Sequence, residues 1–289
     1  MCDTCGCNIT PGNLRFAYKP LNGTTAVAVL KNLLARNDDQ ATHNRYHFDQ
    51  HRILTINLMS SPGSGKTALL EATIDALHHE YRIGVIEGDL DTENDAKRIR
   101  AKGVPAHQIT TGSACHLDAH MVHDALHQFP LSGLDILFIE NVGNLVCPAS
   151  FDLGQHRNVV LLSVTEGDDK PSKYPVIFRA ADLVLFTKSD LLPVLDDFSL
   201  ERAEDNLRNL ASSAPVIQLS ARHALGLQEV NPRSRIGSND VRSQLSVPEP
   251  SARDGLQQRR LLQSSLRLRP RLHMPSNSLR PEAWSRWRH

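Results

Sequence analysis

Long apolar runs are missing from this sequence of 289 residues: no stretch of eighteen apolar residues occurs, which excludes a transmembrane helix. The first residues, Met1 to Cys5, contain neither a basic segment nor an apolar one, so we expect no signal peptide. Aromatic residues are scarce, at 5 %, but the 40 % of hydrophobic residues is enough for a core of ordinary size. These features predict a cytoplasmic protein of one or two domains with no membrane partner.

The chain as a whole has no excess of charge of one sign, but its C-terminal segment is basic and the remainder is acidic. The 32 basic and 32 acidic residues balance, whereas residues 231–289 hold twelve arginines, no lysine and four acidic residues. This region is rich in Arg, Ser, Pro and Gln and shows no alternation of strands and helices. We interpret residues 225–289 as disordered or as the product of a shifted reading frame, in preference to a basic arm that binds nucleic acid.

Upstream of this tail, short apolar runs alternate with helical patterns. Residues 25–51 carry apolar side chains at helical spacing, and from residue 53 onward strand-like runs alternate with candidate helices. Alternation of this kind predicts a doubly wound α/β fold with a mostly parallel sheet. We expect an N-terminal arm and helix over residues 1–51, an α/β domain over residues 52–224, whose activity the motifs below predict, and the tail. The expected strands span residues 53–59, 83–87, 136–140, 159–164, 183–186 and 216–219, and the expected helices within the domain span residues 67–79, 93–102, 117–128, 175–181 and 199–211.

A phosphate-binding loop follows the first expected strand. Its sequence, SSPGSGKT, matches the pattern G-x-x-x-x-G-K-[ST] except at the first position, where Ser60 replaces glycine. Backbone N–H groups of such a loop cradle phosphates at the start of the next helix. The lysine is expected to neutralise the β- and γ-phosphates, and the threonine hydroxyl to ligate Mg²⁺. A turn that only joins strand to helix is the less favoured alternative. The residues assigned to the nucleotide here are Gly63, Ser64, Gly65, Lys66 and Thr67.

The base is predicted by the residues that follow the fifth expected strand, TKSD at positions 187–190. The carboxylate of Asp190 can accept hydrogen bonds from guanine N1–H and N2–H₂, whereas adenine offers no such pair of donors. The stem of Lys188 can pack over the flat base. Residues 220–222, after the next strand, resemble the guanine-side loop of GTPases. We therefore predict that the protein hydrolyses GTP to GDP and phosphate, slowly and with Mg²⁺.

Two acidic residues at strand ends complete the expected nucleotide site. Asp89 follows the second expected strand and Glu140 ends the third, and both positions suit Mg²⁺ or its water shell. Gly143 follows Glu140 in the place where GTPases usually carry Asp-x-x-Gly, so we expect it to meet the γ-phosphate. The alternative for each acid is a helix cap or a surface carboxylate. No general base is assigned, although Asp89 and Asp95 are candidates. The catalytic assignments are Lys66, Thr67, Asp89 and Glu140.

Cysteine is also scarce, and the odd count of five argues against a disulfide framework. Cys2, Cys5 and Cys7 lie within six residues. If the initiator methionine is removed, their thiolates and the new α-amine provide four S/N donors. Ni²⁺ accepts such a set in a tetragonal field, whereas Zn²⁺ prefers tetrahedral thiolates. We favour a nickel-carrying arm over a structural zinc clip or a redox dithiol.

A second group of metal ligands is expected on loops that follow strands, where an α/β sheet places its ligands. Its members are Cys115, His116 and Cys147. Three ligands fall short of a closed structural site, so two subunits that share a metal here would couple dimerisation to nucleotide state. His43, His47 and His51 also share one helix face; a solvated amphipathic helix is at least as well supported there as a metal-binding face, so these histidines are not assigned to a site.

Together these motifs resemble the HypB family of hydrogenase nickel-incorporation GTPases, in the SIMIBI class of P-loop proteins. The resemblance rests on residues 1–7, 60–67, 88–89, 112–118, 139–148, 163–168 and 187–190, and it extends over residues 1–224. It implies a protein that dimerises with GTP and metal and delivers nickel to the [NiFe]-hydrogenase large subunit with a HypA-type nickel chaperone. It also implies a tight nickel site at Cys2, Cys5 and Cys7. At Cys115, His116 and Cys147 it implies a weaker site where Ni²⁺ and Zn²⁺ compete.

The sequence departs from this family pattern at two places. Thr187 replaces the more usual Asn of the base motif, and the chain enters the tail where family members close with a helix. Loss of that helix would leave apolar sheet area in water at about 25 cal/mol per Å², so we expect weakened stability. Two alternative functions are a metallochaperone for another nickel enzyme such as urease and a nickel-storage protein with a vestigial P-loop. The cysteine arm argues against the first, and intact Lys66, Thr67 and Asp190 argue against the second.

Overall fold

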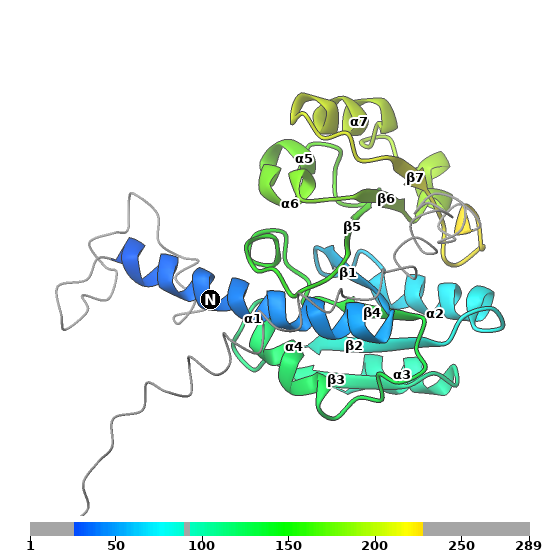
Figure 1. The fold of residues 1–289 in the computed structure, drawn as a ribbon. Helices are drawn as coiled ribbons and strands as arrows, with labels where there is room; N and C mark the ends of the chain where they lie inside the picture. The colour runs from blue at the N-terminus through cyan, green and yellow to red at the C-terminus, as the bar shows by residue number, and fades with distance from the viewer. Residues whose placement is uncertain (1–25, 90–92, 228–289) are drawn as a thin grey trace, which may run out of the picture. The chain divides into compact units, whose positions relative to one another are not determined.

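The computed structural model describes residues 26–89 and 93–227 (Figure 1). The arm with Cys2, Cys5 and Cys7 and the tail from residue 228 lie outside the described residues. The strands are β1 (Leu54–Ser60), β2 (Ile83–Asp89), β3 (Ala106–Thr110), β4 (Ile136–Glu140), β5 (Arg157–Ser163), β6 (Leu183–Thr187) and β7 (Val216–Gln218). The α-helices are α1 (Ala26–His51), α2 (Lys66–Leu77), α3 (Asn94–Ala101), α4 (Ala119–Leu126), α5 (Lys170–Lys173), α6 (Pro175–Arg179) and α7 (Leu200–Asn209), with short 3₁₀ helices η2 (Pro148–Ser150) and η3 (Ser189–Val194).

All seven described strands form one parallel sheet in the order β3-β2-β4-β1-β5-β6-β7. β1 leads into the phosphate-binding loop and lies centrally, paired with β4 on one side and β5 on the other. Each of its seven residues is buried, as expected for a parallel strand that is covered on both faces. The predicted doubly wound fold is confirmed, and all six predicted strands are present within two residues of their expected ends.

One strand, β3, was not predicted from the sequence. It lies at the sheet edge, pairs with β2, and its residues are half-buried or exposed. Its sequence, AHQIT, lacks the continuous apolar run of a central strand, because an edge strand has less surface to bury. The base motif therefore follows the sixth strand of the sheet and not the fifth.

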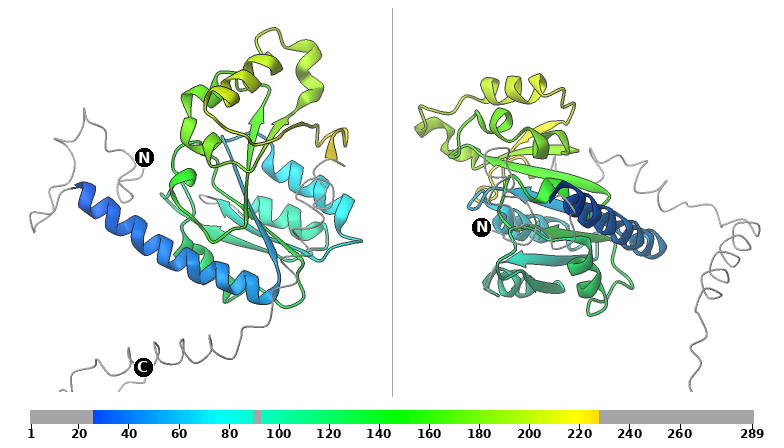
Figure 2. Two further views of the ribbon diagram at one scale, coloured as in Figure 1. Left: turned by 45° about the horizontal axis from the view of Figure 1, so that its top comes forward. Right: turned by 90° about the vertical axis from the view of Figure 1, so that its left-hand side faces the viewer.

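Helices cover both faces of the sheet (Figures 1 and 2). On one face, α2 and α3 contribute Leu70, Ile74 and Ile99 to a core shared with alternate residues of the strands. On the other face, α1 and α4 pack over β2 and β4, while α6 and α7 pack over β5 and β6. Alternate residues of each strand thus serve two separate apolar layers, which explains why the strand sequences are apolar throughout.

The predicted helix before the domain is α1, and buried amide side chains attach it to the domain. Asn44 is fully buried and donates through Nδ2 to the carbonyl oxygens of Ala119 (2.8 Å) and Leu153 (3.1 Å). Asn37 accepts a hydrogen bond from the backbone N–H of Ala119 (2.9 Å) and donates to Asp152 O (2.8 Å). Because these groups are buried and paired, α1 has one fixed position against the start of α4. No helix in the described ranges is long and apolar enough to cross a membrane.

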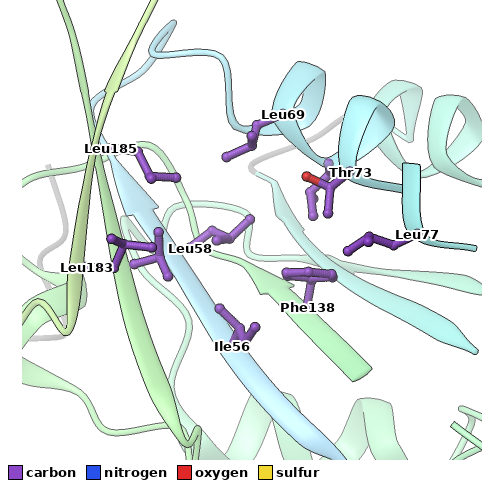
Figure 3. A pocket seen from close by; sticks show the side chains of 10 residues that line it. Ile56, Leu58, Leu69, Thr73, Leu77, Phe138, Leu183 and Leu185 are labelled. Carbon is purple, nitrogen blue, oxygen red and sulfur yellow. The ribbon is translucent and has the colours of Figure 1, made fainter. Parts of the chain in front are cut away.

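A small apolar cavity lies between α2 and the sheet (Figure 3). Side chains of Leu69, Thr73 and Leu77 on α2 face residues of β1, β4 and β6 across it. The hydroxyl of Thr73 is the one polar side-chain group among its lining residues, so the cavity offers little to orient a polar substrate. It is a gap in the core, and Leu227 packs against the same apolar cluster. The remaining lining residues are Ile56, Leu58, Leu70, Phe138, Val159, Leu183 and Leu185.

Candidate nucleotide and metal site

The phosphate-binding loop joins β1 to α2 as predicted. Gly63 (φ 77°) and Gly65 (φ 92°) adopt the left-handed backbone conformation that favours glycine, and α2 begins at the next residue. Lys66 is buried, and its Nζ donates to Ser60 Oγ (2.9 Å). Ser60 occupies the position where the pattern has glycine, so the departure from the pattern supplies the acceptor that orients Lys66. The Ser60 hydroxyl in turn donates to Ser61 O (2.7 Å).

A pair of buried carboxyl groups lies beside the start of α2. Thr67 Oγ1 donates to Glu140 Oε1 (3.0 Å), and Glu140 lies in register with Glu87 of the neighbouring strand β2. Burial, followed by the charge of Glu140, raises the pKa of Glu87 to about 10, and Lys66 opposes the shift. Burial also raises the pKa of Glu140, again opposed by Lys66. The two acids therefore hold a proton between them, with Glu87 donating to Glu140.

Asp89 and Asp95 lie near this pair. Asp89 ends β2, and its carbonyl accepts the backbone N–H of Thr111 (2.9 Å). Asp95 lies in the first turn of α3, pairs with Arg98 (3.0 Å), and its charge raises the pKa of both buried glutamates. The structure thus places both candidate bases near the buried carboxyl pair, and the role of each stays a prediction.

The base motif packs directly on the phosphate-binding loop. Thr187 Oγ1 donates to Ser64 O (2.7 Å), and Lys188, with φ of 58°, donates from Nζ to Gly63 O (2.8 Å). Thr187 therefore holds the loop through its hydroxyl where the family more often has Asn. The hydroxyl of Ser220 lowers the pKa of Asp190, and nearby His223 and Arg222 add to the effect. Asp190 is accordingly a carboxylate, the form that can accept two N–H groups.

Gly143 lies against the phosphate-binding loop. A Cβ at this position would come within 2.9 Å of Pro62 Cα and N, which real Cβ atoms do not approach. Glycine thus allows the loop after β4 to touch the loop after β1. The contact agrees with the predicted place of Gly143 near the nucleotide phosphates, and its role toward the γ-phosphate stays a prediction.

The three ligands predicted on strand-end loops do come together. Cys115 Sγ lies 2.9 Å from Cys147 Sγ and 3.7 Å from His116 Nδ1, and the three ligand atoms lie within 4.8 Å of one another. His116 is buried and stacks on Phe151 with 3.9 Å between ring centroids. Burial lowers the pKa of His116, opposed by Asp118, so the imidazole is neutral and available as a ligand.

One detail of this region differs from the prediction. Cys115 and His116 were expected to start a helix, but α4 begins only at Ala119. The side chain of Asp118 caps α4 by accepting the backbone N–H of Met121 (2.8 Å). A helix N-cap requires extended backbone, so the residues before Asp118 belong to the loop that follows β3. This leaves Cys115 and His116 opposite Cys147, which follows β4.

Comparison with known proteins agrees with this geometry. The family of CobW/HypB/UreG nucleotide-binding domains matches residues 54–218. The hydrogenase maturation factor HypB of Azotobacter chroococcum mcd 1 is 50 % identical over 226 residues, which is 75 % of this chain and 73 % of that protein. The hydrogenase/urease maturation factor HypB of Helicobacter hepaticus (strain ATCC 51449 / 3B1) is 44 % identical over 222 residues, or 75 % and 90 %. The crystal structure of HypB from Helicobacter pylori in complex with nickel aligns with a TM-score of 0.67 and 40 % identity, covering 74 % of this chain and 99 % of that chain.

The chain belongs to the HypB family.

Two acidic side chains of this HypB domain were not assigned from its sequence. Glu87 is 2 % exposed and shares a proton with Glu140; its signal in the sequence is a charged residue that directly follows the apolar run of β2. Glu166 follows β5 and accepts a hydrogen bond from Ser64 Oγ (2.5 Å). Its motif, residues 163–168, contributed to the resemblance, but only the folded chain shows that its carboxylate contacts the phosphate-binding loop.

Proposed function

We propose that the chain is a GTP-hydrolysing nickel metallochaperone that inserts Ni²⁺ into the large subunit of [NiFe]-hydrogenase during maturation. Membership of the HypB family supports this, as does the crystal structure of a HypB with nickel. Within the described residues, one observation carries the proposal. Loop 141–147 lies between the buried carboxyl pair at Glu140 and the thiolate–imidazole cluster at Cys147, so a nucleotide site and a metal site share one short segment.

The nucleotide side of the proposal rests on local contacts. Gly63, Ser64, Gly65, Lys66 and Thr67 hold the phosphates. The ammonium group of Lys66 leaves Ser60 to meet them, while Asp190 reads guanine and Lys188 covers the base. Gly143 lies where the loop after β4 can approach the γ-phosphate. These groups bind and orient GTP, and orientation together with charge neutralisation accounts for most of the rate in phosphoryl transfer.

The residues at the start of α2 fit Mg²⁺. Within the described part of the chain, Glu140 Oε2 and Glu87 Oε1 are buried without a hydrogen-bond partner. Together with the Thr67 hydroxyl they form a set of hard oxygen donors, the type that Mg²⁺ prefers. We propose that Thr67 and Glu140, with Asp89 at the adjacent strand end, hold the ion or its water shell. The bound ion supplies neutralisation of phosphate charge.

The cargo is proposed to occupy two sites. Cys2, Cys5 and Cys7 form the tight nickel site of the arm, and Cys115, His116 and Cys147 form a weaker site where Ni²⁺ and Zn²⁺ compete. In one chain the second site has three ligands, so a metal shared by two subunits fits a homodimer that depends on GTP and metal. A HypA-type nickel chaperone is the proposed partner in the transfer, which exchanges thiolate ligands for those of the hydrogenase large subunit.

A nickel titration of the full chain tests this proposal. It is done with and without a non-hydrolysable GTP analogue and compared with a Cys2/Cys5/Cys7→Ala variant. We expect the variant to lose tight binding but to keep a weaker site whose affinity shifts with nucleotide. Adding Asp190→Ala to that variant should abolish the shift, because the analogue no longer binds well. A single nickel site that ignores nucleotide would contradict the coupling, and a chain with no GTP hydrolysis would be a storage protein.

Urease maturation is a second candidate function, favoured by the relative whose name covers both hydrogenase and urease. The same GTPase and metal sites would serve either enzyme, since both accept nickel. Loading of purified apo-hydrogenase large subunit and of apo-urease, each with the nickel-bound chain and GTP, separates the two. Transfer to urease alone would replace hydrogenase as the target.

A further inference from the structure

A cluster of histidines lies between α1 and α4, on the two helices that run side by side in Figure 1. His43 and His47 come from α1, His123 comes from α4, and His127 is the C-cap residue of α4. The ring centroids of His43 and His123, on different helices, lie 5.1 Å apart. Four imidazoles from two elements therefore face one another at a place distant in sequence from Cys147 and from the N-terminal cysteines.

The separations between ring nitrogens suit a shared metal ion. His43 Nε2 and His47 Nε2 lie 3.0 Å apart, and His123 Nε2 and His127 Nε2 lie 3.2 Å apart. Two nitrogens bound to one ion at about 2.0–2.1 Å, at tetrahedral or octahedral angles, lie about 3 Å from each other. Ligand atoms of His43, His47 and His123 all fall within 4.8 Å of one another, so small side-chain rotations bring the three onto one ion.

Each helix supplies its pair of ligands at the spacing that chelation on a helix requires. His43 and His47 are four residues apart, as are His123 and His127, so each pair lies on one face of its helix. Asn44, next to His43, anchors α1 to the carbonyl oxygen at the first residue of α4. The backbone on both sides of the cluster is therefore held in place before any metal binds, which lowers the entropic cost of closing the site.

The surroundings of two of the imidazoles, His47 and His123, favour the neutral form that binds metal. Burial lowers the pKa of His123, and neighbouring His127, His43 and His47 lower it further, while Asp124 opposes them. Burial and the charges of His43, His51 and His127 lower the pKa of His47 as well.

We propose that His43, His47 and His123, with His127 as a fourth ligand, form a binding site for a borderline divalent ion, Ni²⁺ or Zn²⁺. Imidazole ligands suit both ions. The site ties α1, which continues the N-terminal segment that carries Cys2, Cys5 and Cys7, to α4, which follows the loop with Cys115 and His116. It differs from both cysteine sites in having no thiolate.

The test is a Ni²⁺ titration of the full chain that follows both stoichiometry and the ultraviolet thiolate-to-nickel absorption. We expect a His43→Gln/His123→Gln variant to bind one equivalent fewer than the parent while the thiolate absorption is unchanged. A His79→Gln/His120→Gln variant is the matched control, because it removes two exposed histidines, one just beyond α2 and one on α4. It should bind as the parent does.

Because His123 is partly buried, the single variant His43→Gln, at an exposed residue, is measured as well. It should weaken the thiolate-free equivalent at least about tenfold, a loss typical of damage to a metal site. The proposal is overturned if the double variant and its control bind the same number of equivalents. It is also overturned if the lost equivalent carries thiolate absorption, or if His43→Gln leaves the affinity unchanged. None of these three results bears on nucleotide coupling at Cys147, so this inference and the proposed function fail independently.

Discussion

Replacing Glu87 with glutamine should stabilise the metal-free, nucleotide-free protein above pH 5. The buried position, together with the charge of Glu140, raises the pKa of Glu87 from 4.5 to about 10. Between these two values the unfolded chain loses the proton and the folded chain keeps it. Stability from this group is therefore fully present below pH 4.5 and falls as the pH rises toward 10.

The size of the effect follows from the proton count. A difference of one bound proton changes the free energy of unfolding by about 1.4 kcal/mol per pH unit. Over the three units from pH 5 to pH 8 the limit is about 4 kcal/mol. Coupling to Glu140, which shares the proton, and relaxation around a buried charge reduce the change, so we expect about 2–4 kcal/mol.

Urea unfolding at pH 5, 6, 7 and 8 in the presence of EDTA measures this change. The difference in unfolding free energy between Glu87→Gln and the parent should be small at pH 5 and grow with each pH unit. Glu201→Gln, at an exposed carboxylate in the first turn of α7, is the control and should keep the parent's pH profile. A Glu87→Gln profile parallel to that of the parent across this range would refute the reasoning.

Two further changes test the packing around the site and at the end of the domain. Gly143→Ala places a Cβ within 2.9 Å of Pro62 backbone atoms and forces the two loops apart. We expect the free energy of unfolding, measured with urea, to fall by about 1–3 kcal/mol. A fluorescent GTP analogue should also bind more weakly. A chain that ends at residue 224 loses Leu227, which packs against the apolar core between α2 and the sheet, so its Tm should fall below that of the full chain. A chain with an amphipathic helix added after residue 224 should have a higher Tm than either of these chains, by about 2–4 °C for each kcal/mol of unfolding free energy that the helix adds. Equal Tm values for the three chains would contradict the argument for a missing helix.

The sequence predicted the elements whose pattern is local. β1, β2 and β4 to β6 are buried on both faces, so their apolar runs are visible without knowledge of the neighbours. β3 has a neighbour on one side and polar residues such as His107, and its pairing with β2 exists only in the folded sheet. Edge strands are less constrained toward apolar composition, which is why periodicity did not reveal this one.

The same distinction applies to the site. Lys66, Thr67 and Asp190 belong to contiguous motifs, and the structure places them where the motifs indicated. The partner of Glu87 follows from the register between β2 and β4, which the sequence does not show. The histidines of α1 contact His123, which lies 76 residues after His47 in the sequence. Sequence spacing shows which side chains share one helix face, but not which second element packs against that face.

The arrangement around β4 gives the proposed coupling a physical basis. Glu140 at the end of β4 accepts hydrogen bonds from Thr67 and Glu87, so an ion and phosphates bound at α2, as proposed, would change both contacts. Gly143, three residues later, touches the phosphate-binding loop, and Cys147 is the N-cap residue of η2. In the proposed mechanism, a shift of Gly143 against Pro62 passes through residues 144–146 to Cys147 and changes its distance from Cys115. Metal bound by both cysteines would then bind the GTP and GDP states with different affinity, and by linkage it would change the preference for GTP over GDP by the same factor.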